Sequence, residues 1–156
     1  MAIEIERKFL LAGDGWRKLV RRSEKLRQGY LTTGGQGVTV RVRSIDDVRG
    51  FITIKSGGSA LARAEFEYEV PIADARQLLA LSRGAQIEKT RHSLELPGGD
   101  WVVDEFHGRH EGLIIVEVEL ESPSSALDLP PWLGDEVTGD PQYYNSSLAM
   151  LVGGEI

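Results

Sequence analysis

Short runs that alternate apolar and polar residues constrain the fold of this chain more than any other feature of its sequence. They read IEIERKFLL, VTVRVRS, FITIKS, AEFEYEV, QIEKTRHSLEL, WVVDEF and LIIVEVELE, and Gly, Pro, Ser or Asp mark most of their boundaries. Alternation with a period of two is typical of strands that bury one face. Six or more such strands with few helices between them predict a mainly β (α+β) protein, with an antiparallel sheet that is closed or nearly closed.

Three stretches have features of helices. Residues 72–82, IADARQLLALS, place apolar and small side chains along one side of a helix. Residues 124–129, SSALDL, are a short candidate with a serine as N-cap. Residues 141–152, PQYYNSSLAMLV, form a third candidate, with Asp140 as its cap and Pro141 in its first turn. The Pro-rich segment before the third candidate is expected to wrap the surface.

The basic stretch WRKLVRRSEKLR, residues 16–27, has several possible readings. It favours a solvated helix or loop over a nucleic-acid contact, and Trp16, Leu19 and Val20 are expected to anchor it. Residues 28–33, QGYLTT, favour a further short strand.

Length and composition predict one domain over residues 1–156 in a soluble protein. The chain has no cysteine, and no apolar run approaches the roughly 20 residues that span a membrane. Early charges interrupt any signal peptide, so we expect a cytoplasmic protein without membrane contact. The net charge of −6 argues against a nucleic-acid coat but not against an anionic ligand in a basic pocket. The oligomeric state is left open, and a homodimer is compatible with the sequence.

The second faces of these strands carry like charges two residues apart. In EIERK the acids Glu4 and Glu6 precede Lys8, and further pairs are Arg41 with Arg43, Glu65 with Glu67, Lys89 with Arg91, and Glu117 with Glu119. One interpretation is an outer face in water. However, adjacent like charges repel one another, and an unusual number of them gather here. A barrel with its charged faces inward would compensate them with bound ions.

Acidic and basic walls inside one barrel indicate two kinds of ligand. Carboxylate oxygens without Cys or a His cluster favour Mg²⁺ or Mn²⁺ over Zn²⁺. Arg and Lys beside such a metal bind phosphate oxygens, the arrangement that phosphoryl chemistry needs. The charge pattern therefore predicts a site for phosphate and metal inside a barrel.

The same residues resemble a known family. EIERKF is similar to the ExExK signature of the CYTH superfamily, the triphosphate tunnel metalloenzymes. The resemblance continues in order through QGYLTT, VRVR, TIKS, RAEFEYEV, IEKTRHSLEL, VDEF, IIVEVEL and DEVTGD-QYYNSSLA, nearly the whole chain, and is strongest to short bacterial members. It implies an eight-stranded antiparallel tunnel barrel with a few flanking helices and a C-terminal helix near the tunnel. It also implies binding of a triphosphate with Mg²⁺ or Mn²⁺.

The resemblance carries roles onto individual residues. Glu4 and Lys8 become catalytic candidates. The implied metal ligands are Glu4, Glu6, Asp104, Glu117 and Glu119. The implied triphosphate-binding residues are Lys8, Arg41, Arg43, Lys55, Arg63, Lys89 and Arg91, and Glu65 and Glu67 are further tunnel acids. Tyr144 stands where related sequences often carry a plug-helix Lys, and it can contact phosphate or water without adding positive charge.

Other residues favour structural roles. His107 and His110 lie in a glycine-interrupted run that indicates a surface turn, and His92 is expected to be structural. KSGGSA lacks the spacing of a phosphate loop and is expected to be a turn that keeps only Lys55 as a site residue. Trp101, Trp132 and Tyr30 are expected mainly to pack.

Metal-dependent hydrolysis of a short triphosphate, with inorganic tripolyphosphate as first candidate, is the leading functional hypothesis. A thiamine triphosphatase or an adenylate cyclase of the same family is the second. The third is a polyphosphate-binding module without turnover, which the tyrosine at position 144 keeps open.

Overall fold

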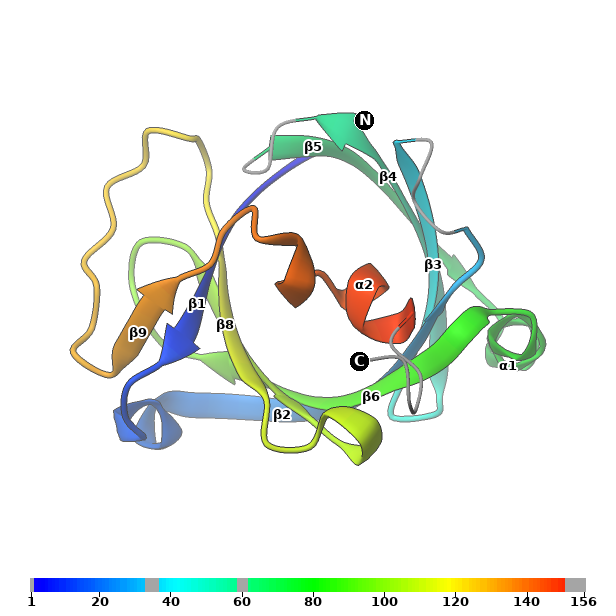
Figure 1. Ribbon diagram of the computed structural model, residues 1–156, viewed down its shortest axis with the longest axis horizontal. Helices are drawn as coiled ribbons and strands as arrows, with labels where there is room; N and C mark the ends of the chain where they lie inside the picture. Colours follow the sequence, from blue (N-terminus) through cyan, green and yellow to red (C-terminus); the bar gives the residue numbers. More distant parts are fainter. Residues whose placement is uncertain (1, 33–36, 59–61, 151–156) are drawn as a thin grey trace.

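A computed structural model describes residues 2–32, 37–58 and 62–150, and an antiparallel sheet closed into a barrel forms its centre (Figure 1). Around the barrel the strands follow the order β5-β4-β3-β2-β6-β7-β8-β1, and β1 pairs with β5 to close the ring. A ninth strand, β9, also pairs with β1. The strands are β1 (Ala2–Leu11), β2 (Val20–Tyr30), β3 (Val38–Ile45), β4 (Arg49–Gly58), β5 (Ala62–Val70), β6 (Arg83–Leu94), β7 (Asp100–Phe106), β8 (Ile114–Glu119) and β9 (Leu133–Glu136). The predicted closed antiparallel barrel is confirmed.

Helices are short and few in the described part of the chain. They are α1 (Ile72–Ala80), α2 (Asn145–Met150) and the 3₁₀ turns η1 (Gly15–Leu19), η2 (Gly108–His110) and η3 (Pro141–Tyr143). The helix expected over residues 72–82 is confirmed as α1. The helix expected at residues 124–129 is wrong, because that segment has no regular structure in a loop ending at β9.

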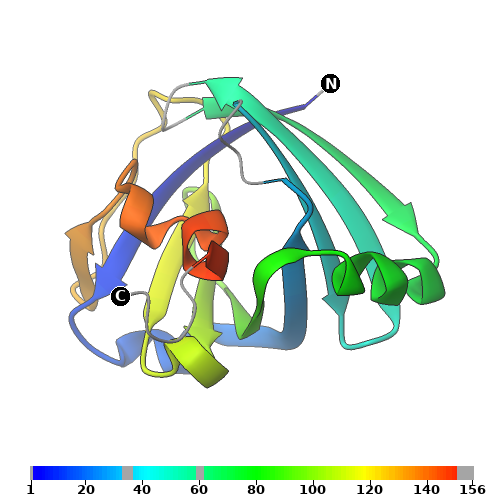
Figure 2. The same cartoon turned by 45° about the vertical axis from the view of Figure 1, so that its right-hand side comes forward.

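The C-terminal helical segment is divided at Tyr144. Asp140 caps η3 as expected, since its side chain accepts a hydrogen bond from the backbone N–H of Gln142. Extended backbone at Tyr144 (φ −71°, ψ 134°) then ends η3 before α2 begins. Figure 1 shows α2 within the outline of the ring, whereas α1 lies against its outside (Figure 2).

The expected helix or loop at residues 16–27 is wrong for most of its length, because Val20–Tyr30 form the long strand β2. The alternation is hidden, since both faces of this strand carry polar residues. Its inward side holds Gln28, which hydrogen-bonds Tyr30 and Arg43 rather than packing in an apolar core. The anchors were correct: Trp16 is 1% exposed, and Leu19 and Val20 pack against the same apolar cluster.

Apolar side chains of the barrel wall point outward and are covered from outside. On β1, for example, buried Ile5 and Phe9 alternate with the inward charges. They pack in a cluster completed by Trp16, Leu94, Trp101, Val103, Val116, Val118, Leu120 and Trp132, which come from neighbouring strands, η1 and the loop before β9. The rings of Trp101 and Trp132 meet edge to face at 6.2 Å, so their expected packing role is confirmed.

A second apolar cluster closes one end of the barrel interior. Leu148 and Ala149 of α2 pack on Ile87, Phe106 and Ile115, which precede or follow inward charged residues at a spacing of two. Tyr30 belongs to this cluster and also borders the cavity, which goes beyond the packing role expected for it. The interior thus has an apolar end beneath α2 and a charged remainder.

The three histidines lie outside the charged interior. Nδ1 of His92 pairs with Ser23 Oγ at 2.7 Å and Nε2 with Glu105 Oε1 at 2.6 Å, which confirms a structural role. His107 and His110 border the turn η2, as expected for a surface turn. The turn expected at KSGGSA is wrong for its first four residues, because 55–58 belong to β4. Its last two residues lie outside the described residues, as do 33–36, 61 and the chain from residue 151. No helix among the described residues is long and apolar enough to cross a membrane.

Candidate functional site

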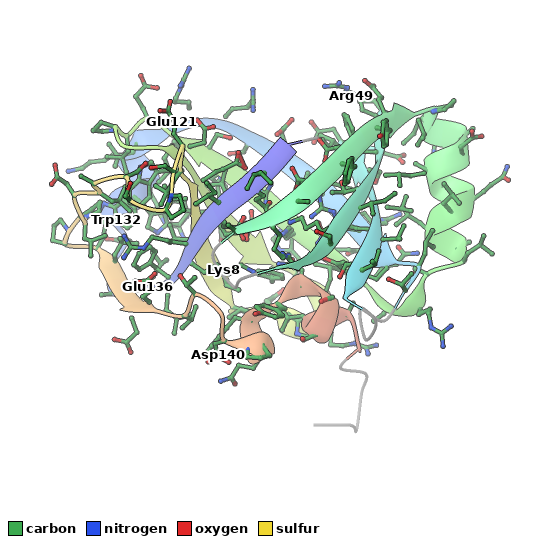
Figure 3. The ribbon with its side chains drawn as sticks, turned by 90° about the horizontal axis from the view of Figure 1, so that it is seen from above. Lys8, Arg49, Glu121, Trp132, Glu136 and Asp140 are labelled. Atoms are coloured by element: carbon green, nitrogen blue, oxygen red, sulfur yellow. The ribbon has the colours of Figure 1, made fainter. Side chains whose placement is uncertain are left out.

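A cavity of about 260 Å³ occupies the charged part of the barrel interior. All eight strands of the ring and the segment that leads into α2 contribute to its lining. The lining residues are Glu4, Glu6, Lys8, Tyr30, Thr39, Arg41, Arg43, Thr53, Lys55, Arg63, Glu65, Glu67, Lys89, Arg91, Asp100, Val102, Glu117, Glu119, Tyr144, Asn145 and Ser146. Figure 3 shows Arg49 and Glu121 at the rim of the molecule and Lys8 nearer its middle.

Strand register explains why these side chains converge. Lys8 on β1 lies directly opposite Glu117 on β8, and Glu6 lies opposite Glu119. On its other edge β1 pairs with β5, where Glu4 lies opposite Arg63. Directly opposed residues of paired strands point to the same face of the sheet, so the residues opposite an inward-facing charge also face inward.

The acids of β1 differ in how they are compensated. Lys55 Nζ donates to both carboxylate oxygens of Glu4 at 2.9 Å. Burial raises the pKa of Glu4, but the charge and hydrogen bonds of Lys55 outweigh it and leave the pKa below its usual value. Burial and the nearby Glu117 and Glu4 carboxylates raise the pKa of Glu6 to about 7. Among the described residues, no side chain forms a hydrogen bond or a close ion pair with Glu6, and the more distant Lys8 and Lys55 do not offset the rise in its pKa.

A tightly paired group of charges forms the wall made by β6, β7 and β8. Asp104 Oδ2 lies 2.7 Å from Lys89 Nζ, and its two oxygens accept from Arg91 Nε and Nη2 at 2.8 and 2.9 Å. Arg91 also donates to Glu117 at 3.1 Å, and Lys8 Nζ lies 3.6 Å from the same carboxylate. Despite burial, Arg91 and Lys89 hold the pKa of Asp104 far below its usual range. Lys8 and Arg91 likewise keep the pKa of buried Glu117 down at about 2.

Cations are crowded at this wall. Burial, with Arg91 and Arg43 nearby, lowers the pKa of Lys89 to about 7, although Asp104 opposes the shift. Burial beside Arg41 and Arg91 also lowers the pKa of Arg43. Crowded cations in a closed space are stabilised by an anion that binds between them.

Arg41 has an unsatisfied donor. Its Nη2 donates to Thr53 Oγ1 at 3.0 Å, and Thr53 in turn donates to Glu67 at 2.8 Å. Its Nε is buried and has no hydrogen-bond partner among the described residues. A buried donor without an acceptor is costly in free energy, so this position favours an acceptor supplied by a ligand.

The cavity brings together almost every site residue expected from the sequence. All seven predicted phosphate-binding cations line it, as do Glu4, Glu6, Glu65, Glu67, Glu117, Glu119 and Tyr144. Asp104 is the exception: it lies behind Lys89 and Arg91, 1% exposed, and does not line the cavity. Tyr144 places its ring 5.6 Å from Lys8 Nζ, which also donates to the Tyr143 carbonyl at 3.3 Å.

Sequence reasoning missed six polar residues of the site. Gln28 and Asn145 hydrogen-bond the cations Arg43 and Lys89, and Thr39, Thr53, Asp100 and Ser146 line the cavity. For Gln28 the available signal was its period-two spacing to Tyr30 in the strand expected at residues 28–33, which is confirmed for residues 28–30 as the end of β2.

Comparisons with known proteins agree with this geometry. The CYTH domain family matches residues 2–147. The chain belongs to the CYTH family. This confirms the resemblance drawn from EIERKF and the ordered strand motifs.

Two curated CYTH relatives are similar over nearly their whole length, and both are named inorganic triphosphatase. The protein from Acetivibrio thermocellus is 41% identical over 149 residues, which cover 95% of this chain and 94% of the relative. The protein from Nitrosomonas europaea is 40% identical over 154 residues, which cover 96% and 98%.

Solved structures support the same fold. A crystal structure of an inorganic triphosphatase matches with a TM-score of 0.70 and 38% identity, covering 99% of both chains. A protein from Pyrococcus horikoshii matches at 18% identity with a TM-score of 0.62, covering 77% of this chain and 79% of the other, and it supports the fold alone.

Proposed function

We propose that this chain is a metal-dependent triphosphatase that hydrolyses short triphosphates, with inorganic tripolyphosphate as the first substrate to test. The observation that carries the proposal is an enclosed cavity in which seven Lys and Arg side chains face a group of carboxylates. Both curated relatives bear the name inorganic triphosphatase at about 40% identity, which supports the same reaction here.

The cationic wall binds the phosphate chain. Arg41 offers an unsatisfied buried Nε–H, and Arg43 and Lys89 add charge where burial weakens competition from water. The remaining members of the phosphate-binding set are Lys8, Lys55, Arg63 and Arg91. Charge that builds up on the leaving diphosphate is stabilised by cations already held in place.

The acidic wall fits a divalent cation. Among the described residues no three His, Asp or Glu side chains stand in a ready-made metal site. However, the uncompensated Glu6 carboxylate, with Glu117 and Glu119 on the facing strand, offers the oxygen donors that Mg²⁺ or Mn²⁺ prefers. We assign the metal to Glu4, Glu6, Glu117 and Glu119. When bound, it neutralises phosphate oxygens and lowers the pKa of bound water.

Asp104 takes a different role in this assignment. Its oxygens already accept from Lys89 and Arg91, so it orients these two cations rather than meeting the metal. Glu65 and Glu67 line the cavity and contribute to its negative field.

The reaction needs little covalent chemistry from the protein. A water oxygen attacks the terminal phosphorus and the P–O bond to the bridging oxygen breaks. One proton of the water stays on the phosphate product, and the other passes to the diphosphate that leaves. Glu4, kept ionised by Lys55, accepts a hydrogen bond from this water and orients it. Lys8, between Glu117 and the η3 segment, contacts the phosphate chain.

Phosphate release from tripolyphosphate, measured with Mg²⁺ and with Mn²⁺, tests the proposal. We expect turnover by the wild-type protein and its loss in Glu4→Gln, with the melting temperature retained. Glu69→Gln is the matched control, because Glu69 pairs with Arg49 in solvent outside the cavity. A folded wild-type sample without turnover of tripolyphosphate, thiamine triphosphate or ATP would overturn the enzyme assignment.

Cyclic AMP and diphosphate from ATP would instead identify a cyclase. Tight tripolyphosphate binding without hydrolysis would instead support the hypothesis of a polyphosphate-binding module, which the tyrosine at position 144 allows. A cytoplasmic location, the single domain over residues 1–156, the absence of nucleic-acid and membrane partners and the homodimer stay predictions.

A further inference from the structure

Two neutral amides link α2 to the cationic wall. Lys89 Nζ donates to Asn145 Oδ1 at 2.9 Å, and Gln28 Nε2 donates to the same oxygen at 3.1 Å. Gln28 Oε1 accepts from both Nε and Nη2 of Arg43, at 3.0 and 2.8 Å. Arg43, Gln28, Asn145 and Lys89 thus form one continuous hydrogen-bonded chain, called the amide bridge below.

The orientation of both amides follows from the chemistry of their partners. Arginine and lysine donate hydrogen bonds and cannot accept them. Arg43 therefore requires the carbonyl oxygen of Gln28, which leaves the Gln28 NH₂ group facing Asn145. That NH₂ group and Lys89 both require the oxygen of Asn145 on their side. Only one arrangement of the bridge satisfies all four groups.

Burial makes the bridge rigid. Gln28 is 0% exposed, Lys89 2% and Arg43 8%. Breaking a hydrogen bond at this depth costs free energy, since water cannot replace the lost partner. Lys89 is held from two sides, by Asn145 and by Asp104 at 2.7 Å. Long side chains that would otherwise sample several rotamers are fixed before any ligand arrives.

We propose that Gln28 and Asn145 are positioning residues, which hold Arg43 and Lys89 in the geometry that binds the phosphate chain. This inference rests on the proposed triphosphatase function and assigns the two amides a part in it. Neither amide carries charge, so each acts through the cation that it holds. Because Asn145 begins α2, the bridge also ties the helix at the closed end of the cavity to the phosphate-binding wall.

Isothermal calorimetry on Asn145→Ala and Gln28→Met tests the proposal. Each substitution removes the bridge without removing a charge, and we expect tripolyphosphate affinity to fall about tenfold in each, as for loss of a buried hydrogen bond to a charged group. Mn²⁺ affinity measured without tripolyphosphate should stay within twofold, because none of the acids assigned to the metal forms a hydrogen bond with Gln28 or Asn145. General damage to the barrel would lower the affinity for both tripolyphosphate and Mn²⁺.

The double variant sharpens the test. Both amides belong to the same amide bridge, so replacing the second after the first should cost little further affinity. The fold-loss of tripolyphosphate affinity in the double variant should therefore be clearly smaller than the product of the two single fold-losses. Ser147→Ala is the matched control on α2, at a side chain that does not line the cavity, and should leave both affinities unchanged. If Gln28→Met lowers the melting temperature, Asn145→Ala decides alone, since alanine favours a helix.

Unchanged tripolyphosphate affinity in Asn145→Ala would overturn the proposal, as would an equal loss of Mn²⁺ affinity. A double variant whose fold-loss of tripolyphosphate affinity equals the product of the single fold-losses would also contradict one continuous amide bridge. A wild-type protein that binds tripolyphosphate but releases no phosphate would overturn the proposed function, and the calorimetric result would still decide the role of the two amides.

Discussion

Replacing Asp104 with Asn should destabilise the protein more than any other charge-removing substitution in the barrel. Asp104 is 1% exposed and compensates Lys89, which is equally buried, together with Arg91. The neutral amide keeps the shape but leaves Lys89 without an ionised partner and Arg91 with Glu117 alone. Removing one partner of a buried ion pair costs ~3–5 kcal/mol, a large fraction of the stability of a domain this size.

Urea unfolding followed by tryptophan fluorescence measures this loss, since Trp16, Trp101 and Trp132 are all buried. A loss of 3 kcal/mol corresponds to a melting temperature about 10 °C lower. Asp47→Asn is the matched control, because Asp47 pairs with Arg76 in open solvent, and we expect no measurable change there.

The pH dependence gives the same prediction a second readout. The folded pKa of Asp104 lies far below its ordinary value of 3.8, so its stabilisation is present above that value and is lost as the pH falls further. The difference between wild type and Asp104→Asn should therefore be full at pH 6 and shrink below pH 4. A loss under ~1 kcal/mol at pH 6 would refute the view that this carboxylate holds the cationic wall together.

Two further predictions concern stability. Glu6→Gln should stabilise the metal-free protein at pH 8 by roughly 2 kcal/mol. The folded pKa of Glu6 is raised from 4.5 to about 7, so the stability that the protonated carboxyl gives at low pH is lost as the pH rises through 7. If the melting temperatures of both proteins changed equally between pH 5 and 8, the prediction would be contradicted. Gly50→Ala should destabilise by ~1–3 kcal/mol, because a Cβ there would lie 2.5 Å from Ala75 Cβ and push α1 from the barrel. Gly13→Ala, whose Cβ would meet nothing closer than 3.7 Å, is its control, and equal melting temperatures would show that α1 yields freely.

The barrel was predictable because most of its strands alternate strongly. Val38, Val40 and Val42 on one face of β3 leave Arg41 and Arg43 on the other, and no other regular structure separates them so cleanly. β2 failed the same test, since Glu24, Leu26 and Gln28 mix charge, apolar and amide groups on its inner face. Periodicity of hydrophobicity detects a strand only where one face is apolar.

The identity of the site residues was also predictable, but their division of labour was not. The sequence places Asp104 on the same inward face as Val102, two residues away. This spacing is equally compatible with a side chain that lines the cavity and with one buried behind its lining. Only the register of β6 with β7, which sets Arg91 directly opposite Asp104, shows that two cations cover the carboxylate. Gln28 and Asn145 lie 117 residues apart, and nothing in either local sequence indicates that they meet.

Incomplete pairing of charge, rather than net charge, gives this interior its specificity. Seven cations and seven carboxylates line the cavity, so their formal charges cancel. The two signs are only partly paired: Glu6 lacks a cation, and Arg41 retains an unsatisfied Nε–H. A polyanion alone would accept from the free donor of Arg41 but would leave Glu6 without a cation, and a divalent cation alone would do the reverse. The cavity is therefore complementary to the two together, which is why a phosphate chain bound with its metal fits it better than either ion alone.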